Sequence, residues 1–222
     1  VVVEDHESEE GKIGSLGAII QVIDEYGADD YLVVGGDNYT ELDLARFVDA
    51  AQAHGAPTIA CYEVDDRADA SAFGVVDVDD DGRITGFVEK PEEPPSNLVS
   101  TLFYYFPEEA MDMLDAYVDA HEDSDADYLD EPGRLIEWAY TRQDWYAHGF
   151  SGSWYDIGTP ANYLKAQAAL ADRRVDGKVT DSDLGENVWI MDGAEVSNSD
   201  LEDCIVFPDA DISDARLQGT IV

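Results

Sequence analysis

Tyr31-Leu-Val-Val-Gly-Gly-Asp37-Asn38 is the stretch of this 222-residue sequence on which the fold class depends. Its first four residues form a short apolar run of the kind typical of a buried strand. Gly-Gly-Asp-Asn follows at the carboxyl end of that run, which is the edge where open α/β sheets bind ligands. Glycine allows a ligand close to the backbone, and an aspartate there can hold Mg²⁺. Gly-Asp-Asn triplets also occur in ordinary turns, so this stretch needs support from elsewhere in the chain.

The segments on either side of this stretch alternate between helix and strand. Residues Ser15–Tyr26 and Leu44–His54 carry apolar side chains at helical spacing, and Gly27 and Gly55 follow them as stop signals. Thr58–Val64 is the next predicted strand. Strand, helix and strand in this order predict an α/β fold with a mixed, mostly parallel, Rossmann-like sheet and helices on its faces.

The rest of the first 175 residues continues this pattern. The predicted strands are 73–78 and 83–89 (joined by a hairpin turn), 98–106, 145–150 and 153–157, and the predicted helices are 107–120, 132–142 and 160–173. We expect residues 1–175 to form one domain and 176–222 a second.

A second strand end resembles the first. Trp154-Tyr-Asp156-Ile-Gly158-Thr159-Pro160 consists of an apolar start, an aspartate, a glycine and a proline that begins a helix. A helix-capping turn, with Thr159 as the N-cap, explains the same residues without any ligand. If Asp37 and Asp156 meet in the fold, however, they would form a Mg²⁺ site suited to phosphate chemistry.

The chain after Lys178 has a different spacing of apolar residues. Leu184, Ile190 and Val196 recur every six residues, and Val206 and Ile212 repeat that spacing after a slip. This period fits neither a helix nor a simple strand, and it predicts a hexapeptide β-helix of two or three coils. The alternative is an irregular β tail whose spacing arose by chance. A short β-helix with an open end would favour association, so we expect a homo-oligomer.

The composition is strongly acidic, with 51 Asp and Glu against 12 Lys and Arg and a formal net charge of -39. This balance argues against binding to nucleic acids or anionic membranes. Because the acids lie among apolar residues along the whole chain, we predict a halophilic protein that works in concentrated salt. A specific cation-binding protein is the alternative.

Cys61 and Cys204 form no motif and suit a reduced cytoplasm. No apolar run approaches the length of a membrane span.

Taken together, these stretches resemble the sugar nucleotidyltransferases, with glucose-1-phosphate thymidylyltransferase-like and mannose-1-phosphate guanylyltransferase-like enzymes as the nearest branches. The resemblance covers nearly the whole chain. It rests on the two stretches quoted above together with Phe73-Gly74-Val-Val, Phe87-Val-Glu89-Lys90-Pro91 and Pro95-Ser-Asn-Leu-Val99. A β-helix after the catalytic domain is common in this family, and in the family it is left-handed.

The resemblance implies a reaction in which a sugar 1-phosphate attacks the α-phosphate of an NTP and pyrophosphate leaves. Asp37 and Asp156 would hold Mg²⁺. Lys90 would contact the sugar phosphate, and Glu89 would accept hydrogen bonds from sugar hydroxyls. Asn38 would contact substrate beside Asp37.

The resemblance also assigns the remaining substrate-binding residues. Gly74 would let the backbone approach the sugar, and Val99 would line the sugar pocket. The segment Ile13-Gly14-Ser-Leu16-Gly would pack near the nucleotide base, with Gly14 and Leu16 as its contacts. The family usually has a small residue where this chain has Ser100-Thr-Leu, and an acidic insert at 7–12 precedes the base segment.

The largest departure is at the N-terminal side. The family has a Gly-Gly-x-Gly-Thr-Arg loop that cradles the triphosphate with backbone N–H groups, and this sequence contains none. We therefore expect an N-terminally incomplete sheet and a chain that is inactive by itself. A non-catalytic sugar-nucleotide-binding or assembly homologue is the alternative. A separate acyltransferase activity of the β-helix is a weaker third hypothesis, because no His follows His148.

Overall fold

The computed structural model describes residues 14–121 and 126–222, and its contacts fall into two compact units. One unit runs to Gly36 and continues from Glu41 to Gly152, and the other combines Asp37–Thr40 with Ser153–Val222. We expected a boundary after residue 175. The second unit resumes at Ser153, so it includes two short strands and a helix in addition to the C-terminal coils. The expectations for Ile13 and for the acidic insert lie outside the described residues.

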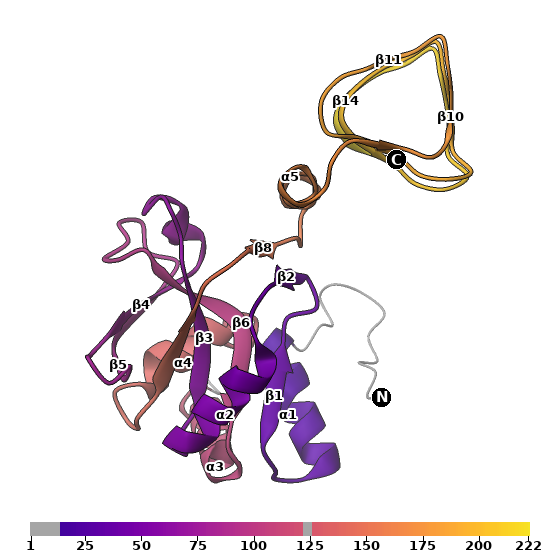
Figure 1. The fold of residues 1–222 in the computed structure, drawn as a ribbon. Helices are drawn as coiled ribbons and strands as arrows, with labels where there is room; N and C mark the ends of the chain where they lie inside the picture. Colours follow the sequence, from indigo (N-terminus) through magenta and orange to yellow (C-terminus); the bar gives the residue numbers. More distant parts are fainter. Residues whose placement is uncertain (1–13, 122–125) are drawn as a thin grey trace. The chain divides into compact units, whose positions relative to one another are not determined.

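The first unit is built on a six-stranded sheet with the order β5-β4-β6-β3-β7, in which β1 also pairs with β6 (Figure 1). The strands are β1 (Tyr31–Val34), β3 (Thr58–Glu63), β4 (Gly74–Val78), β5 (Ile84–Glu89), β6 (Leu98–Phe106) and β7 (Tyr146–Phe150).

The pairing corrects one expectation about this sheet. The mixed α/β fold is confirmed, but among the described strands of this sheet only β3 and β7 pair in parallel. The long strand β6 runs antiparallel to β1, β3 and β4. It follows the β4–β5 hairpin in the chain and lies between β4 and β3 in the sheet.

Helices cover both faces of the sheet. They are α1 (Gly14–Tyr26), α2 (Leu44–His54), α3 (Met111–His121) and α4 (Pro132–Ala139), with short 3-10 segments at Asp69–Ala72, Glu108–Ala110 and Ala126–Leu129. Alternation along β6 places Tyr104 and Phe106 in one core with α1, α3 and α4. Phe103 and Tyr105 face the opposite way, toward α2.

The bounds of α2 follow from local chemistry. Asp43 is the N-cap and accepts a hydrogen bond from the backbone N–H of Arg46, and Gly55 closes the helix in the left-handed conformation at φ 60°. The helix expected from Pro107 begins only at Met111, after a 3-10 turn. Within the described parts of the chain, no helix is both long and apolar enough to cross a membrane.

The second unit contains a two-stranded antiparallel sheet, a helix and a β-solenoid. Strand β2 (Asn38–Thr40) pairs with β8 (Trp154–Asp156). Helix α5 (Pro160–Leu170) follows, with Thr159 as an N-cap whose side chain accepts a hydrogen bond from the backbone N–H of Asn162. The N-cap prediction for Thr159 is therefore confirmed.

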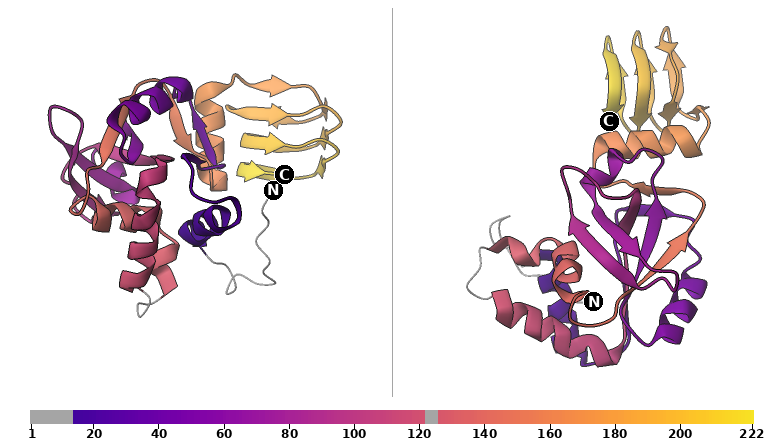
Figure 2. Two further views of the ribbon diagram at one scale, coloured as in Figure 1. Left: turned by 90° about the horizontal axis from the view of Figure 1, so that it is seen from below. Right: turned by 90° about the vertical axis from the view of Figure 1, so that its left-hand side faces the viewer.

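The solenoid stacks about three coils (Figure 2). Its strands are β9 (Arg174–Val175), β10 (Lys178–Thr180), β11 (Asp183–Leu184), β12 (Val188–Ile190), β13 (Glu195–Ser197), β14 (Asp200–Val206), β15 (Asp211–Ser213) and β16 (Arg216–Ile221). All of its strand pairs among the described residues are parallel. The β-helix expectation is confirmed in this form, and the irregular β tail is not what forms.

Stacking brings the apolar residues of the six-residue pattern into register. Ile190 pairs with Val206, and Val196 pairs with Ile212, with all four side chains buried in the solenoid core. The slip in the sequence pattern reflects a coil of 16 residues between Ile190 and Val206. Aspartate and asparagine occupy left-handed positions at the corners, at Asp181, Asn187, Asn198, Asp203, Asp209 and Asp214.

Candidate functional site

Asp37 and Asp156 are brought together by the β2–β8 pair in the second unit. Asn38 lies directly opposite Asp156 in the register of these strands. One step beyond the pair, the backbone N–H of Ile157 donates to the backbone carbonyl of Asp37 at 2.8 Å. Two residues far apart in the sequence are therefore held by backbone hydrogen bonds at the same end of a small sheet.

The two carboxylates border one space beside Gly158. A Cβ atom added to Gly158 would lie 2.8 Å from Asp37 Oδ2 and 3.2 Å from Asp156 Oδ1. The backbone N–H of Gly158 also donates to Asp156 Oδ1 at 2.9 Å. Glycine at this position therefore keeps the space between the carboxylates open and helps to orient one of them.

Asn38 orients the other carboxylate. Its Nδ2 donates to Asp37 Oδ1 at 3.0 Å, and its Oδ1 accepts a hydrogen bond from Trp154 Nε1 at 2.8 Å. The buried indole thus fixes which way the amide of Asn38 points, and the amide in turn fixes Asp37. Among the described residues, no hydrogen-bond donor reaches Asp37 Oδ2 or Asp156 Oδ2.

This pair of aspartates fits a magnesium ion that shares its coordination with substrate. Mg²⁺ prefers oxygen ligands and is usually bound through one or two carboxylates together with substrate phosphates and water. In the described parts of the chain there is no group of three or more His, Cys, Asp and Glu side chains that could hold a metal alone. Two carboxylates with open oxygens on a shared space are the donor set that a substrate-bridged Mg²⁺ needs.

Glu89 lies at the end of β5 in the first unit, opposite Gly74 of β4. Its Oε2 would be 2.8 Å from a Cβ atom on Gly74 and 1.6 Å from one on Gly133. The carboxylate therefore lies in a cradle formed by two glycines. Burial raises its pKa above the usual range, partly offset by the positive charge of Lys90.

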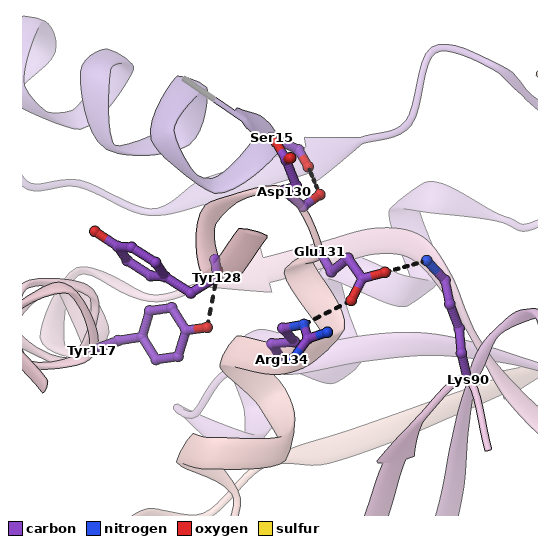
Figure 3. Close-up of polar contacts among 7 residues, drawn as sticks. All are labelled: Ser15, Lys90, Tyr117, Tyr128, Asp130, Glu131 and Arg134. Atoms are coloured by element: carbon purple, nitrogen blue, oxygen red, sulfur yellow. Dashed lines mark hydrogen bonds and ion pairs between the residues drawn. The ribbon is translucent and has the colours of Figure 1, made fainter. Parts of the chain in front are cut away.

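Lys90 follows with its backbone in the left-handed region, at φ 44°, and its N–H donates to the carbonyl of Phe73 at 3.1 Å. Its Nζ donates to Glu131 Oε1 at 2.6 Å. The second oxygen of Glu131 accepts from Arg134 Nε at 2.7 Å (Figure 3). These two hydrogen bonds lower the pKa of Glu131.

The other predicted substrate residues, Gly14, Leu16 and Val99, lie elsewhere in the first unit, and the side chains of Leu16 and Val99 are buried. Gly14 has φ +76°, and a Cβ there would lie 2.5 Å from the carbonyl oxygen of Leu129. Leu16 and Val99 are 1% and 0% exposed. Any substrate contact by these two residues would come from the backbone, and the roles expected for all three stay predictions.

Sequence reasoning did not single out Glu131, Gly133, Arg134 or Gly158. Gly158 was part of a quoted motif, but its function as an opening between two aspartates depends on the β2–β8 pairing. Glu131 precedes a proline at a helix start, which locally indicates an N-cap. Its partner Lys90 is 41 residues away in the sequence, so no local pattern could show the pair.

Comparison with known proteins identifies the family. The family model described as nucleotidyl transferase matches residues 1–173. A glucose-1-phosphate adenylyltransferase of Lachnospira eligens is 31% identical over 174 residues, which are 76% of this chain and 40% of that protein. A provisionally named mannose-1-phosphate guanyltransferase of Sulfolobus acidocaldarius is 27% identical over 86% of this chain and 54% of its own length.

A third relative is the low-salt glycan biosynthesis nucleotidyltransferase of Haloferax volcanii, which is 31% identical over 73% of this chain and 43% of its own length. The chain thus spans about half, or less, of the length of these curated relatives. The family model agrees with the mixed α/β fold of the first unit. The chain belongs to the sugar nucleotidyltransferase family.

Proposed function

We propose that this chain provides the sugar-phosphate and metal-binding parts of an enzyme that makes an NDP-sugar from an NTP and a sugar 1-phosphate with Mg²⁺. The observation that carries the proposal is the pair of carboxylates on one space beside Gly158. A turn that only capped helix α5 would need Thr159, but it would not need Asp37 opposite.

In the proposed reaction, a phosphate oxygen of the sugar 1-phosphate attacks the α-phosphorus of the NTP. A new P–O bond forms, the bond from the α-phosphorus to the bridging oxygen breaks, and pyrophosphate leaves with the electron pair. Asp37 and Asp156 would hold Mg²⁺, which when bound offsets negative charge on the transferring phosphates. Lys90 would bind the sugar phosphate as a point charge, and Glu89 would accept hydrogen bonds from sugar hydroxyls.

The protein surface suggests the working conditions. With a net charge of -39, self-repulsion is strong at low salt and largely screened when the Debye length falls to about 3 Å at 1 M. We propose that the enzyme is halophilic. A homo-oligomer and a cytoplasmic location remain part of the proposal, and two free, buried cysteines are compatible with the latter.

The missing glycine-rich loop favours the second candidate, a homologue that binds sugar nucleotides without catalysis. The 222 residues contain no Gly-Gly-x-Gly-Thr-Arg stretch, so we propose that the chain by itself does not turn over. The retention of two aligned aspartates favours the enzyme, because a binding module has no need for a metal site built from both.

A pyrophosphate-release screen distinguishes the two candidates. The full-length gene product and the 222-residue chain would each be supplied with Mg²⁺, the four common NTPs with dTTP, and glucose or mannose 1-phosphate, in high salt. We expect turnover by the full-length product with at least one substrate pair and none by the 222-residue chain. No turnover by the full-length product with any pair would favour the non-catalytic homologue, and robust turnover by the chain alone would show that the loop is not needed.

A further inference from the structure

Glu131 occupies an N-cap position but does not act as a helix cap. It precedes Pro132 at the start of α4 with extended backbone angles, and its side chain accepts no capping hydrogen bond from the backbone N–H groups of the helix. An acidic residue at this position ordinarily accepts from the first free N–H groups of the helix. Here one carboxylate oxygen accepts from Arg134 of the same helix and the other from Lys90, which follows β5, so the side chain links the helix start to the end of that strand.

Each of the two cations contacts one oxygen of the Glu131 carboxylate. Lys90 Nζ lies 2.6 Å from Oε1 and Arg134 Nε lies 2.7 Å from Oε2 (Figure 3). The Arg134 contact fixes the orientation of the carboxylate, so the oxygen that faces Lys90 has a defined place. Lys90, Arg134 and Glu131 together carry one net positive charge, so Glu131 does not by itself cancel the charge of both cations, and the neighbouring Glu89 carboxylate is a further acid beside Lys90.

The ion pair contributes little to folding. Half of the Lys90 side chain is exposed, as is half of Arg134, and pairs of this kind are worth about 0–1 kcal/mol. A flexible lysine that must bind an anion, however, loses rotamer freedom when it does so. If Glu131 already holds the Lys90 side chain in place, part of that entropy loss is removed from the binding step. The hydrogen bond between them is therefore suited to ordering Lys90.

The same turn of α4 also touches the residue before Lys90. Gly133 has no side chain, and the carboxylate of Glu89 occupies the place where its Cβ would be. Residues 131–134 therefore contact both members of the Glu89–Lys90 pair, one through an ion pair and the other through close packing. The start of α4 therefore packs against a pair that lies at the end of a strand.

We propose that Glu131 is a positioning residue that orders the ammonium of Lys90 for the phosphate of the sugar 1-phosphate. The inference rests on the proposed function, because it takes Lys90 as the phosphate contact. An ammonium has three donors, of which Glu131 uses one and leaves the others for substrate. Arg134 acts through Glu131, by holding its second oxygen.

A double-mutant cycle on ligand binding tests this role. Glucose 1-phosphate and mannose 1-phosphate would be titrated by calorimetry, in high salt with Mg²⁺, into the 222-residue chain and the variants Glu131→Gln, Lys90→Met and the double variant. Glu137→Gln is the matched control, since it removes an exposed acid from the same helix and makes no hydrogen bond to Lys90. Thermal unfolding of each variant checks that it is folded.

We expect Glu131→Gln to weaken binding about tenfold, which corresponds to about 1.4 kcal/mol. It should have no further effect once Lys90 is methionine, whereas a merely structural effect would be the same in both backgrounds. If Glu131→Gln behaves like Glu137→Gln while Lys90→Met still abolishes binding, the positioning role is wrong and the phosphate contact stands. If neither sugar phosphate binds, or Lys90→Met binds normally, the sugar-phosphate site itself is wrong and the inference fails with it.

Discussion

The carboxylates of Asp37 and Asp156 border the same space beside the Cα atom of Gly158, although the two aspartates are more than a hundred residues apart in the chain. The antiparallel pairing of β2 with β8 places them there, and the amide of Asn38 and the backbone N–H of Gly158 orient them.

Gly158→Ala should impair the metal site without unfolding the protein. The added methyl group would lie 2.8 Å from Asp37 Oδ2, a distance that real Cβ atoms do not tolerate, so the carboxylate must move away. We expect at least a tenfold loss of pyrophosphate release by the full-length gene product, or roughly 1.4 kcal/mol of transition-state stabilisation. Gly149→Ala is the control, because a Cβ at that position meets no atom within 4 Å. Equal activity of the two variants would contradict the proposed use of this space.

Gly133→Ala should destabilise the first unit. Alanine in place of glycine inside a helix normally stabilises by up to about 1 kcal/mol. Here the new Cβ would overlap the Glu89 carboxylate at 1.6 Å, and overpacking of this kind costs about 1–3 kcal/mol. Chemical denaturation in high salt would measure the free energy of unfolding. Glu89→Ala in the same chain should relieve the overlap, so a double variant no more stable than Gly133→Ala alone would show that the cradle is not the cause.

The desolvated Glu89 carboxylate should make stability depend on pH in a defined direction. Burial raises its folded pKa above 4.5, so the folded state binds the proton more tightly than the unfolded state and loses stability as pH rises from 4.5 through the folded pKa. Glu89→Gln should therefore be more stable than the unmodified chain at pH 7, and the difference should shrink to nothing near pH 4. Denaturation curves of both chains at several pH values measure it. A difference that is the same at pH 4 and pH 7 would argue against a desolvated carboxylate.

Salt should stabilise the folded chain strongly. The formal charge of -39 repels itself over about 10 Å at 0.1 M salt and over only about 3 Å at 1 M. We expect the thermal midpoint to rise over this range with KCl and with tetramethylammonium chloride alike, because screening depends on ionic strength. A rise with KCl alone would indicate specific cation binding instead, and no rise with either salt would contradict the halophilic proposal.

Elements with strong local signals could be predicted from the sequence to the residue. Strand β1, strand β6 and helix α2 have the bounds that apolar spacing and flanking caps indicated. The direction of β6 could not be predicted, because it depends on which strands it pairs with and not on its own residues. In the solenoid the apolar positions were predicted, whereas the coil length was not, since it depends on how the corners turn, and corner residues such as Asn198 and Asp203 adopt left-handed angles that the apolar spacing does not show.

The residues of the candidate site also include some that the sequence indicated and some that it did not. Asp37, Lys90 and Asp156 stand in recognisable stretches of sequence, so each could be singled out before the structure was known. Glu131 and Gly133 could not, because their contacts with Lys90 and Glu89 join a strand end to a helix start far along the chain. The charge also has more than one cause, because aspartates at the solenoid corners satisfy backbone geometry as well as contributing to an acidic surface.

The most direct test of the account is pyrophosphate release by the full-length gene product carrying Asp37→Asn or Asp156→Asn, measured against Mg²⁺ concentration in high salt. Asparagine keeps the shape of each side chain and removes the charge that a magnesium ion requires. We predict that each variant loses at least a hundredfold in activity, about 2.7 kcal/mol, and that more Mg²⁺ restores part of it. Near-normal activity of either variant at ordinary Mg²⁺ would show that the two aspartates beside Gly158 are not the metal site.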